Sequence, residues 1–289
     1  RSMGARIHDV QGGFIYCNAD RLVGTDIHLS YPSVGATENA MLASVFAEGE
    51  TYIHNAAKEP EIIDLQNFLR AMGAKVSGAG TGVIHIEGVE RKLNDVEYTI
   101  MPDRIVAGTY MIATAMTGGE TLIRNIIPEH INSITSILNE AGSNISISGN
   151  VLKISGPKRS KAIDIVRTLP YPGFPTDMQA PLVSMLSIAD GTSIVIETVF
   201  ENRYKHVDEL MRMGANITVE GRIAVVRGVN KLHGATIFAR DLRGAASLVL
   251  AGLVAEGETV VENIFHLDRG YEKMEAKLAQ LGAIIKRKD

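Results

Sequence analysis

The sequence is poor in aromatic residues and in sulfur. It contains no Trp, its aromatic fraction is 5%, and its one cysteine is Cys17. A single cysteine excludes an internal disulfide framework and any zinc site built on two or more thiolates. This composition is typical of a reducing compartment, so we expect a cytoplasmic protein.

The sequence also lacks an excess of positive charge and a long apolar run. The formal net charge is −4, which argues against nucleic acid as a partner. The longest mainly apolar run, Ala245–Ala255, is far shorter than the roughly 20 residues that cross a bilayer, and no signal peptide is visible. We therefore expect no membrane partner. With 45% apolar residues, the 289 residues can fill the cores of two ordinary domains.

Two short markers repeat along the chain with one common period. Glycines that end a helical pattern recur about every 70 residues: Gly4, Gly73, Gly142, Gly214 and Gly282. Glycines that precede a β-branched run recur with the same period: Gly49, Gly119, Gly191 and Gly257. Between the markers lie an apolar helix, a strand, a second amphipathic helix and two short strands. The pattern predicts an α/β (α+β) protein made of repeated units of two helices and several short strands.

Four such units account for residues 6–289, whereas Arg1–Ala5 match only the end of an earlier helix. We therefore expect the chain to be part of a longer protein. A naturally short paralogue is the alternative.

Helix starts carry the first candidate site residues. Ser33, Asp103 and Asp241 occupy equivalent positions, each at the same spacing before a marker glycine, and all three are good N-cap residues. Capping alone explains these residue types, and for Asp103 we adopt that interpretation. In the third unit Pro175 occupies the same position. Its neighbour Thr176 is the better cap candidate, which leaves Asp177 free for other chemistry.

Arginines near helix starts are a sharper signal. Arg243 and Arg269 are predicted in first helical turns, where a cation opposes the helix dipole by roughly 0.3 to 1 kcal/mol. A bound anion would reverse this cost, since the helix start and the guanidinium would both attract it. Salt bridges to Asp241 or Asp268 are the alternative. Arg203, before the helix of the third unit, is a further candidate.

Other features favour structural roles. Cys17 falls in a predicted strand, so we expect a small half-buried side chain and not a nucleophile. The eight histidines show no metal-like spacing, and we expect no metal and no cofactor. The Gly-rich residues 77–82 lack the Lys of a P-loop, and they are typical of a hairpin turn.

Several long segments in one order resemble the UDP-N-acetylglucosamine enolpyruvyl transferases, and the resemblance spans the whole chain. The segments are Tyr31–Glu38, Asn55–Glu61, Pro172–Ala180, Phe200–Arg203, Asp241–Arg243 and Asp268–Glu272. Two alternatives remain. The shikimate-pathway enolpyruvyl transferases share the architecture but use another acceptor hydroxyl, and a non-catalytic repeat protein could keep the fold as a binding surface.

The resemblance implies the inside-out α/β barrel of enolpyruvyl transferases, with six βαβαββ units in two domains. Residues 1–101 would form an incomplete first domain on the sugar-nucleotide side, and residues 102–289 a nearly complete second domain. Roughly the first 130 residues of the family pattern would be absent, with its N-terminal Lys-Asn pair, an early Arg and a loop bearing a reactive Cys or Asp. We therefore expect no transferase activity from this chain alone, and self-association through the incomplete domain.

The resemblance also assigns roles in the transfer of the enolpyruvyl group of phosphoenolpyruvate to UDP-N-acetylglucosamine. Asp177 would accept a hydrogen bond from the sugar 3′-hydroxyl and act as its general base, or assist it. Arg243 and Arg269 would hold the phosphate and carboxylate of phosphoenolpyruvate, and Arg203 would line the same site. Asp241 would orient a closing loop.

Contacts to the sugar nucleotide are implied for two further segments. Ser33, Val34 and Gly35, with Tyr31 and Pro32 before them, match the segment that receives the diphosphate and uridine. Backbone N–H groups at a helix start suit phosphate oxygens. Tyr31 stands where some members have Lys, which removes one cationic contact. Thr176 and Val199 would line the sugar site.

Overall fold

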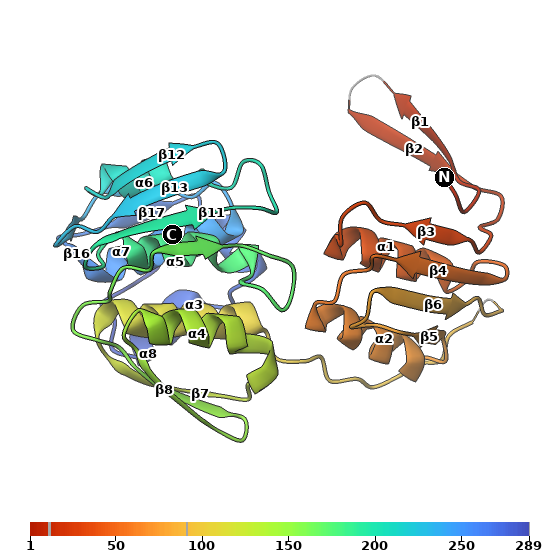
Figure 1. The fold of residues 1–289 in the computed structure, drawn as a ribbon, viewed down its shortest axis with the longest axis horizontal. Helices are drawn as coiled ribbons and strands as arrows, with labels where there is room; N and C mark the ends of the chain where they lie inside the picture. Colours follow the sequence, from red (N-terminus) through yellow and green to blue (C-terminus); the bar gives the residue numbers. More distant parts are fainter. Residues whose placement is uncertain (11–12, 91, 289) are drawn as a thin grey trace. The chain divides into compact units, whose positions relative to one another are not determined.

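The computed structural model describes residues 1–10, 13–90 and 92–288 (Figure 1). The described chain divides into two compact units, Arg1–Met101 and Pro102–Asp289. None of the helices in the described residues combines the length and the apolar character that a membrane span requires.

Unit 1 is a four-stranded sheet with two helices. The strands lie in the order β3 (Asp26–His28), β4 (Glu50–His54), β6 (Val83–Glu87) and β5 (Lys75–Ser77), and only the pair β3–β4 is parallel. The helices are α1 (Val34–Ser44) and α2 (Pro60–Ala71). A separate antiparallel hairpin joins β1 (Arg6–Val10) and β2 (Phe14–Asn18). The core of this unit includes Met41, Ile53, Ile62 and Ile84.

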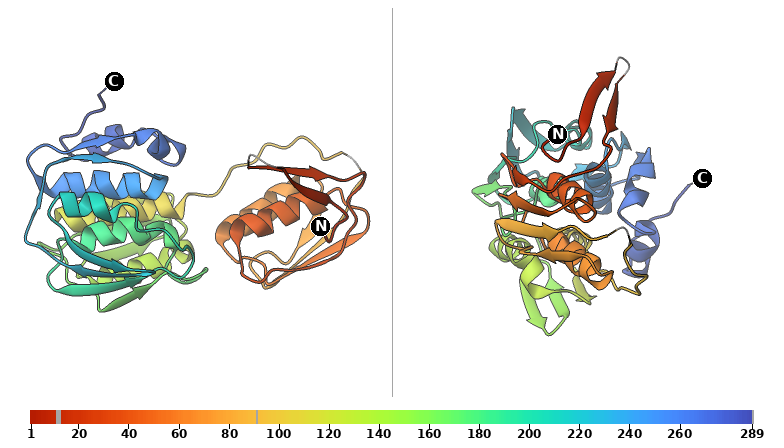
Figure 2. Two further views of the ribbon diagram at one scale, coloured as in Figure 1. Left: turned by 90° about the horizontal axis from the view of Figure 1, so that it is seen from above. Right: turned by 90° about the vertical axis from the view of Figure 1, so that its right-hand side faces the viewer.

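Unit 2 contains a group of helices that are buried on nearly all sides, with sheets outside them (Figure 2). The interior helices are α3 (Arg104–Thr117), α5 (Gln179–Leu186) and α7 (Leu242–Val254). Ser184 of α5 donates a hydrogen bond to the Ser247 carbonyl of α7 at 2.9 Å, so small residues allow these helices to approach closely. Helices inside and sheets outside are the arrangement that the resemblance implied.

The remaining elements of unit 2 form its outer layer. One sheet has the order β7 (Glu120–Arg124), β9 (Val151–Ser155) and β8 (Asn144–Ser148). A second has the order β10 (Ile165–Arg167), β11 (Thr192–Ile196), β13 (Ile223–Arg227) and β12 (Asn216–Glu220). Two parallel pairs follow, β14 (Leu232–His233) with β16 (Ala255–Glu256) and β15 (Thr236–Phe238) with β17 (Val260–Glu262). The outer helices are α4 (Asn132–Glu140), α6 (Val207–Arg212) and α8 (Met274–Gln280), with the short 3-10 helices η1 (Pro128–Ile131), η2 (Thr176–Met178) and η3 (Ile264–Arg269).

The strand β7 has one neighbour fewer than its counterparts β4 and β11 in the first and third repeats. In unit 1, β4 lies between β3 and β6, and in unit 2, β11 lies between β10 and β13. Within the described residues β7 pairs with β9 alone, so its other edge is unpaired.

The repeat glycines have the backbone geometry that the sequence requires. The helix-ending glycines Gly4, Gly73, Gly142, Gly214 and Gly282 all have φ between +91° and +100°. Side chains are strained in this region, so glycine ends each helix without that cost. Among the glycines that precede the β-branched runs, Gly49, Gly191 and Gly257 also have positive φ. In the second repeat the positive φ belongs to Gly118 and not to the predicted Gly119.

The structure confirms the hairpin turn and corrects the burial of Cys17. Residues 78–82 connect the antiparallel strands β5 and β6, so the Gly-rich stretch is a hairpin connection. Cys17 lies in β2 as predicted, but its side chain is exposed and not half-buried. The reason is that the hairpin β1–β2 pairs with no other strand of the described chain.

Candidate functional site

Asp177 lies between two arginines in unit 2. It is the middle residue of η2, directly after Pro175 and Thr176. Its Oδ1 accepts a hydrogen bond from Arg203 Nη2, and its Oδ2 accepts one from Arg243 Nη2 at 3.2 Å. The arginine side chains are only 17% and 14% exposed, whereas that of Asp177 is 39% exposed. A solvent-accessible carboxylate is therefore held by two largely buried cations.

Helix α7 and a tyrosine position Arg243. Asp241 caps this helix, and its Oδ1 accepts the Gly244 N–H at 2.8 Å, which places Arg243 in the first turn. Arg243 Nη1 donates to the Tyr271 hydroxyl at 3.2 Å, and that hydroxyl lies 2.8 Å from Thr109 Oγ1. Since Tyr271 and Thr109 are buried, the guanidinium has a fixed orientation.

A buried carboxylate anchors the segment that leads to Arg203. Glu197 is 1% exposed, and its Oε1 accepts the N–H groups of Val199 at 2.8 Å and Phe200 at 3.0 Å. Its Oε2 accepts the hydroxyl of Thr176 at 2.9 Å. The Phe200 ring centroid then lies 4.7 Å from the Arg203 guanidinium carbon, within the range of a cation–π contact. Glu197 thus joins both segments that form the Asp177 site.

Asp177 and its two arginines stabilise one another's charged forms. Burial by itself raises the pKa of Asp177, but Arg243 and Arg203 outweigh it and hold the pKa below its ordinary value. Burial lowers the pKa of Arg243, and Asp177 and Tyr271 reverse that effect. Asp177 is therefore ionised at neutral pH.

His206 lies beneath the site in a neutral form. It is 3% exposed, and burial lowers its pKa to about 4 despite the opposing charge of Asp241. Its Cβ would lie 3.3 Å from a side chain added at Gly244, so the residue at that position must be small. His206 thus packs against the helix start that carries Arg243.

The candidate residues of unit 1 form the start of α1. Ser33 is the N-cap and its hydroxyl accepts the Ala36 N–H at 3.3 Å, which confirms the predicted cap. Val34 and Gly35 are the first helical residues, whose N–H groups have no acceptor within a helix. Tyr31 and Pro32 lead into this cap, and Tyr31 is 39% exposed. This helix start has the donors that an anion needs.

The predicted placement of Arg269 is wrong. It is the last residue of η3 and not part of a first helical turn, because α8 begins only at Met274. Its side chain is exposed and makes no hydrogen bond or ion pair within the described residues. The backbone nevertheless stays near the site, since the next residue, Gly270, faces Leu242 at the start of α7.

Two further expectations fail. Thr176 does not cap a helix, because η2 begins at Thr176 itself and leaves its hydroxyl free to reach Glu197. The alternative salt bridges are also wrong. Arg243 pairs with Asp177 and not with Asp241, and Asp268 pairs with Arg287 at 2.6 Å.

Sequence reasoning missed the positioning residues. Glu197 has a weak signal, an acid directly after the β-branched run of β11, but many exposed strands end in this way. Thr109 and Tyr271 lie far apart in the sequence, and their contact has no sequence signal.

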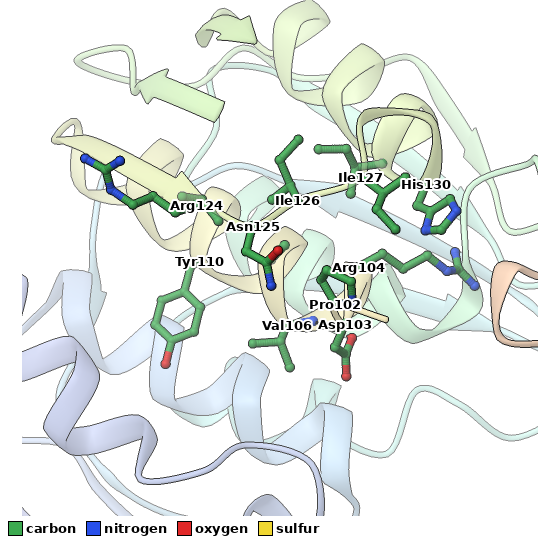
Figure 3. A pocket seen from close by; sticks show the side chains of 13 residues that line it. Pro102, Asp103, Arg104, Val106, Tyr110, Arg124, Asn125, Ile126, Ile127 and His130 are labelled. Carbon is green, nitrogen blue, oxygen red and sulfur yellow. Dashed lines mark hydrogen bonds between the residues drawn. The ribbon is translucent and has the colours of Figure 1, made fainter. Parts of the chain in front are cut away.

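A separate pocket of unit 2 contains none of the predicted site residues. It measures about 260 Å³ and lies between the start of α3, with Asp103, and the end of β7, with Arg124 (Figure 3). Tyr110 lines it, and burial raises the pKa of this phenol to about 12. Asp103 accepts the N–H groups of Ile105 and Val106, which confirms its role as a cap.

Comparisons with known proteins agree with this architecture. The family model of EPSP synthase (3-phosphoshikimate 1-carboxyvinyltransferase) matches residues 1–278. A relative from Caldanaerobacter subterraneus, UDP-N-acetylglucosamine 1-carboxyvinyltransferase 2, is 56% identical over 99% of this chain and 68% of its own length. The crystal structure of the enolpyruvyl transferase NikO from Streptomyces tendae is 25% identical, with a TM-score of 0.87 over 99% of this chain and 70% of that one. EPSP synthase from Acinetobacter baumannii, at 23% identity and a TM-score of 0.69 over 99% of this chain and 70% of that one, shares the fold.

The buried helices, the outer sheets and these matches define the enolpyruvyl transferase class. The 56% identity to the relative from Caldanaerobacter subterraneus is much higher than the 25% identity to NikO, so the chain can be assigned to one family within this class. The chain belongs to the family of the UDP-N-acetylglucosamine 1-carboxyvinyltransferases.

Proposed function

We propose that unit 2 carries the phosphoenolpyruvate site and the general base for enolpyruvyl transfer to the 3′-hydroxyl of UDP-N-acetylglucosamine, the first committed step of peptidoglycan synthesis. In this reaction the sugar hydroxyl gives up its proton and its oxygen bonds to the enol carbon, while the neighbouring CH₂ carbon takes up a proton. The CH₂ carbon then returns its proton as the bond from the enol carbon to the phosphate oxygen breaks, so the double bond is restored and inorganic phosphate leaves with the proton that the hydroxyl lost. The observation that carries the proposal is the position of Asp177 between Arg203 and Arg243.

The ion pairs of Asp177 suggest how the substrate activates the base. Arg203 and Arg243 share the single carboxylate of Asp177, so one positive charge remains to attract an anionic ligand. A phosphate and a carboxylate on phosphoenolpyruvate would compete for the same N–H donors. Once the ligand accepts these N–H groups, Asp177 loses the contacts that depress its pKa and becomes a stronger base.

The other candidate residues have supporting roles in this proposal. Arg269, whose side chain is unpaired within the described residues, is available to hold the second acidic group of phosphoenolpyruvate. Asp241 fixes the start of α7 and orients the closing loop. Thr176 and Val199 line the sugar site, where Glu197 restrains both of them.

We assign the sugar nucleotide to the start of α1 in unit 1. The N–H groups of Val34 and Gly35 would bind the diphosphate, and Ser33 keeps these donors in place. Tyr31 and Pro32 would lie against the uridine.

A binding experiment tests the assignment. Phosphoenolpyruvate is titrated into the chain and the melting temperature is recorded, because a ligand that binds only the folded state raises it. We expect a rise that is lost in Arg243→Met and kept in Arg227→Met, a matched change at an exposed arginine of β13. A rise of equal size in Arg243→Met would refute the site.

We further propose that the 289 residues alone do not turn over, because the family motifs with the Lys-Asn pair and the reactive loop have no match in them. A phosphate-release assay with both substrates should stay at background, and sustained turnover would contradict this. The resemblance also implies a cytoplasmic location. The exposed Phe14, Ile15 and Tyr16 of β2 support self-association through unit 1.

A further inference from the structure

Three side chains of unit 1 converge on one face of its sheet. The parallel register of β3 and β4 places His28 opposite His54, and Asp26 lies two residues before His28 on the same face. The two imidazole rings stack with centroids 4.3 Å apart and an interplanar angle of 6°. His54 Nε2 lies 2.9 Å from Asp26 Oδ1, and one ligand atom from each of the three residues lies within 4.8 Å of the others.

This face of the sheet is open to solvent. On the opposite face, Ile53 of β4 and Ile84 of the neighbouring strand β6 are fully buried in the core of unit 1. The converging side chains point the other way, where Asp26 and His28 are exposed and the His54 side chain is 32% exposed. Ions therefore have direct access to the three side chains.

We propose that Asp26, His28 and His54 bind a divalent transition metal ion of the zinc type. Two imidazoles and one carboxylate are ligands that Zn²⁺ accepts, and solvent would fill the remaining coordination position. Mg²⁺ prefers oxygen ligands in octahedral geometry, so the histidines select against it. The proposal is independent of the transferase reaction.

The present distances fit such a site after small side-chain rotations. Zinc bonds of roughly 2.0 to 2.2 Å at tetrahedral angles separate neighbouring ligand atoms by about 3.3 Å. The pair formed by His54 and Asp26 is already close to that separation, at 2.9 Å. The ligand atom of His28 lies no more than 4.8 Å from the other two, so it must move by at most about 1.5 Å to reach that separation. Rotation of the ring can supply this movement. The backbone therefore does not need to shift.

The proposal gives a common role to the three side chains. The stacked rings bring one nitrogen of each imidazole to the same side of the sheet. The 2.9 Å contact between His54 and Asp26 already holds two of the three ligand atoms together.

The test is a calorimetric titration of the tag-free, chelator-treated chain with ZnCl₂. All variants carry Cys17→Ser, since this exposed thiol is an alternative ligand. We expect one zinc ion per chain, with affinity about tenfold or more weaker in His28→Gln and in His54→Gln, because even outer-shell changes cost roughly 10- to 100-fold. MgCl₂ should give no binding.

The matched control is His85→Gln. His85 lies on β6 of the same sheet, where its Nε2 is 3.3 Å from Glu50 and its ring stacks on Tyr52, outside the proposed ligand set. We expect unchanged zinc affinity in this variant. Absence of saturable binding, or equal affinity in the His28→Gln, His54→Gln and His85→Gln variants, would overturn the proposal.

Discussion

The Thr176 hydroxyl donates a hydrogen bond to Glu197 Oε2 at 2.9 Å, and this contact ties the two segments of the Asp177 site together. The other oxygen of Glu197 accepts two backbone N–H groups, from Val199 and Phe200. A fully buried carboxylate therefore has each oxygen in use.

We predict that Glu197→Gln lowers the free energy of unfolding by about 1 to 3 kcal/mol, because an amide N–H₂ replaces an oxygen that accepts from buried donors. Chemical denaturation measures this change. The control is Glu201→Gln, whose side chain is 88% exposed, and it should be nearly neutral. Equal effects of both changes would show that Glu197 has no anchoring role.

Asp177→Asn should change how stability depends on pH. The folded pKa of Asp177 lies below its unfolded value of about 3.9, so its stabilisation is complete above that value and is lost as the pH falls through the folded pKa. Melting temperatures at neutral pH should therefore be lower in Asp177→Asn, and the difference should vanish in strong acid. The control Asp190→Asn, whose side chain is 79% exposed, should show little difference at any pH.

His206 should make the protein less stable in mild acid. Its folded pKa of about 4 lies below the unfolded value of about 6.5, so the unfolded state takes up the proton first as the pH falls. This difference in pKa lowers the free energy of unfolding by about 2 kcal/mol when the pH falls from 7.5 to 5. Urea denaturation at both pH values measures it. The loss should be smaller in His206→Gln and unchanged in His233→Gln, and a His206→Gln loss as large as that of the wild type would contradict the assignment.

Arg269→Ala should separate binding from stability. Because Arg269 is exposed and unpaired within the described residues, its removal should change the free energy of unfolding by less than about 0.5 kcal/mol. The stabilisation by phosphoenolpyruvate should nevertheless decrease if the side chain holds one of its acidic groups. An unchanged melting shift with ligand would remove Arg269 from the site.

The repeat pattern predicted much of the fold because it depends on local rules. Helix-ending glycines and N-caps act over a few residues, so Gly73 and Ser33 could be placed from spacing alone. The prediction for Arg269 failed because a 3-10 helix, started by Asn263 at φ 58°, takes the place of the expected α-helical start. No local rule distinguishes these two outcomes.

The contacts within the site were only partly predictable. The resemblance grouped Asp177 with Arg203 and Arg243, and the structure brings the three together. It did not indicate that the carboxylate would pair with both arginines at once. The histidines of unit 1 were missed because His28 and His54 belong to different strands with a helix between them in the sequence, and only the parallel register of β3 and β4 places them side by side.

The unpaired edge of β7 offers backbone N–H and C=O groups for pairing with one more strand. Backbone donors and acceptors along Glu120–Arg124 are spaced to receive an extended polypeptide as a fourth strand, in the way that β10 completes β11. A strand paired there would run alongside Arg124, which lines the pocket at the start of α3.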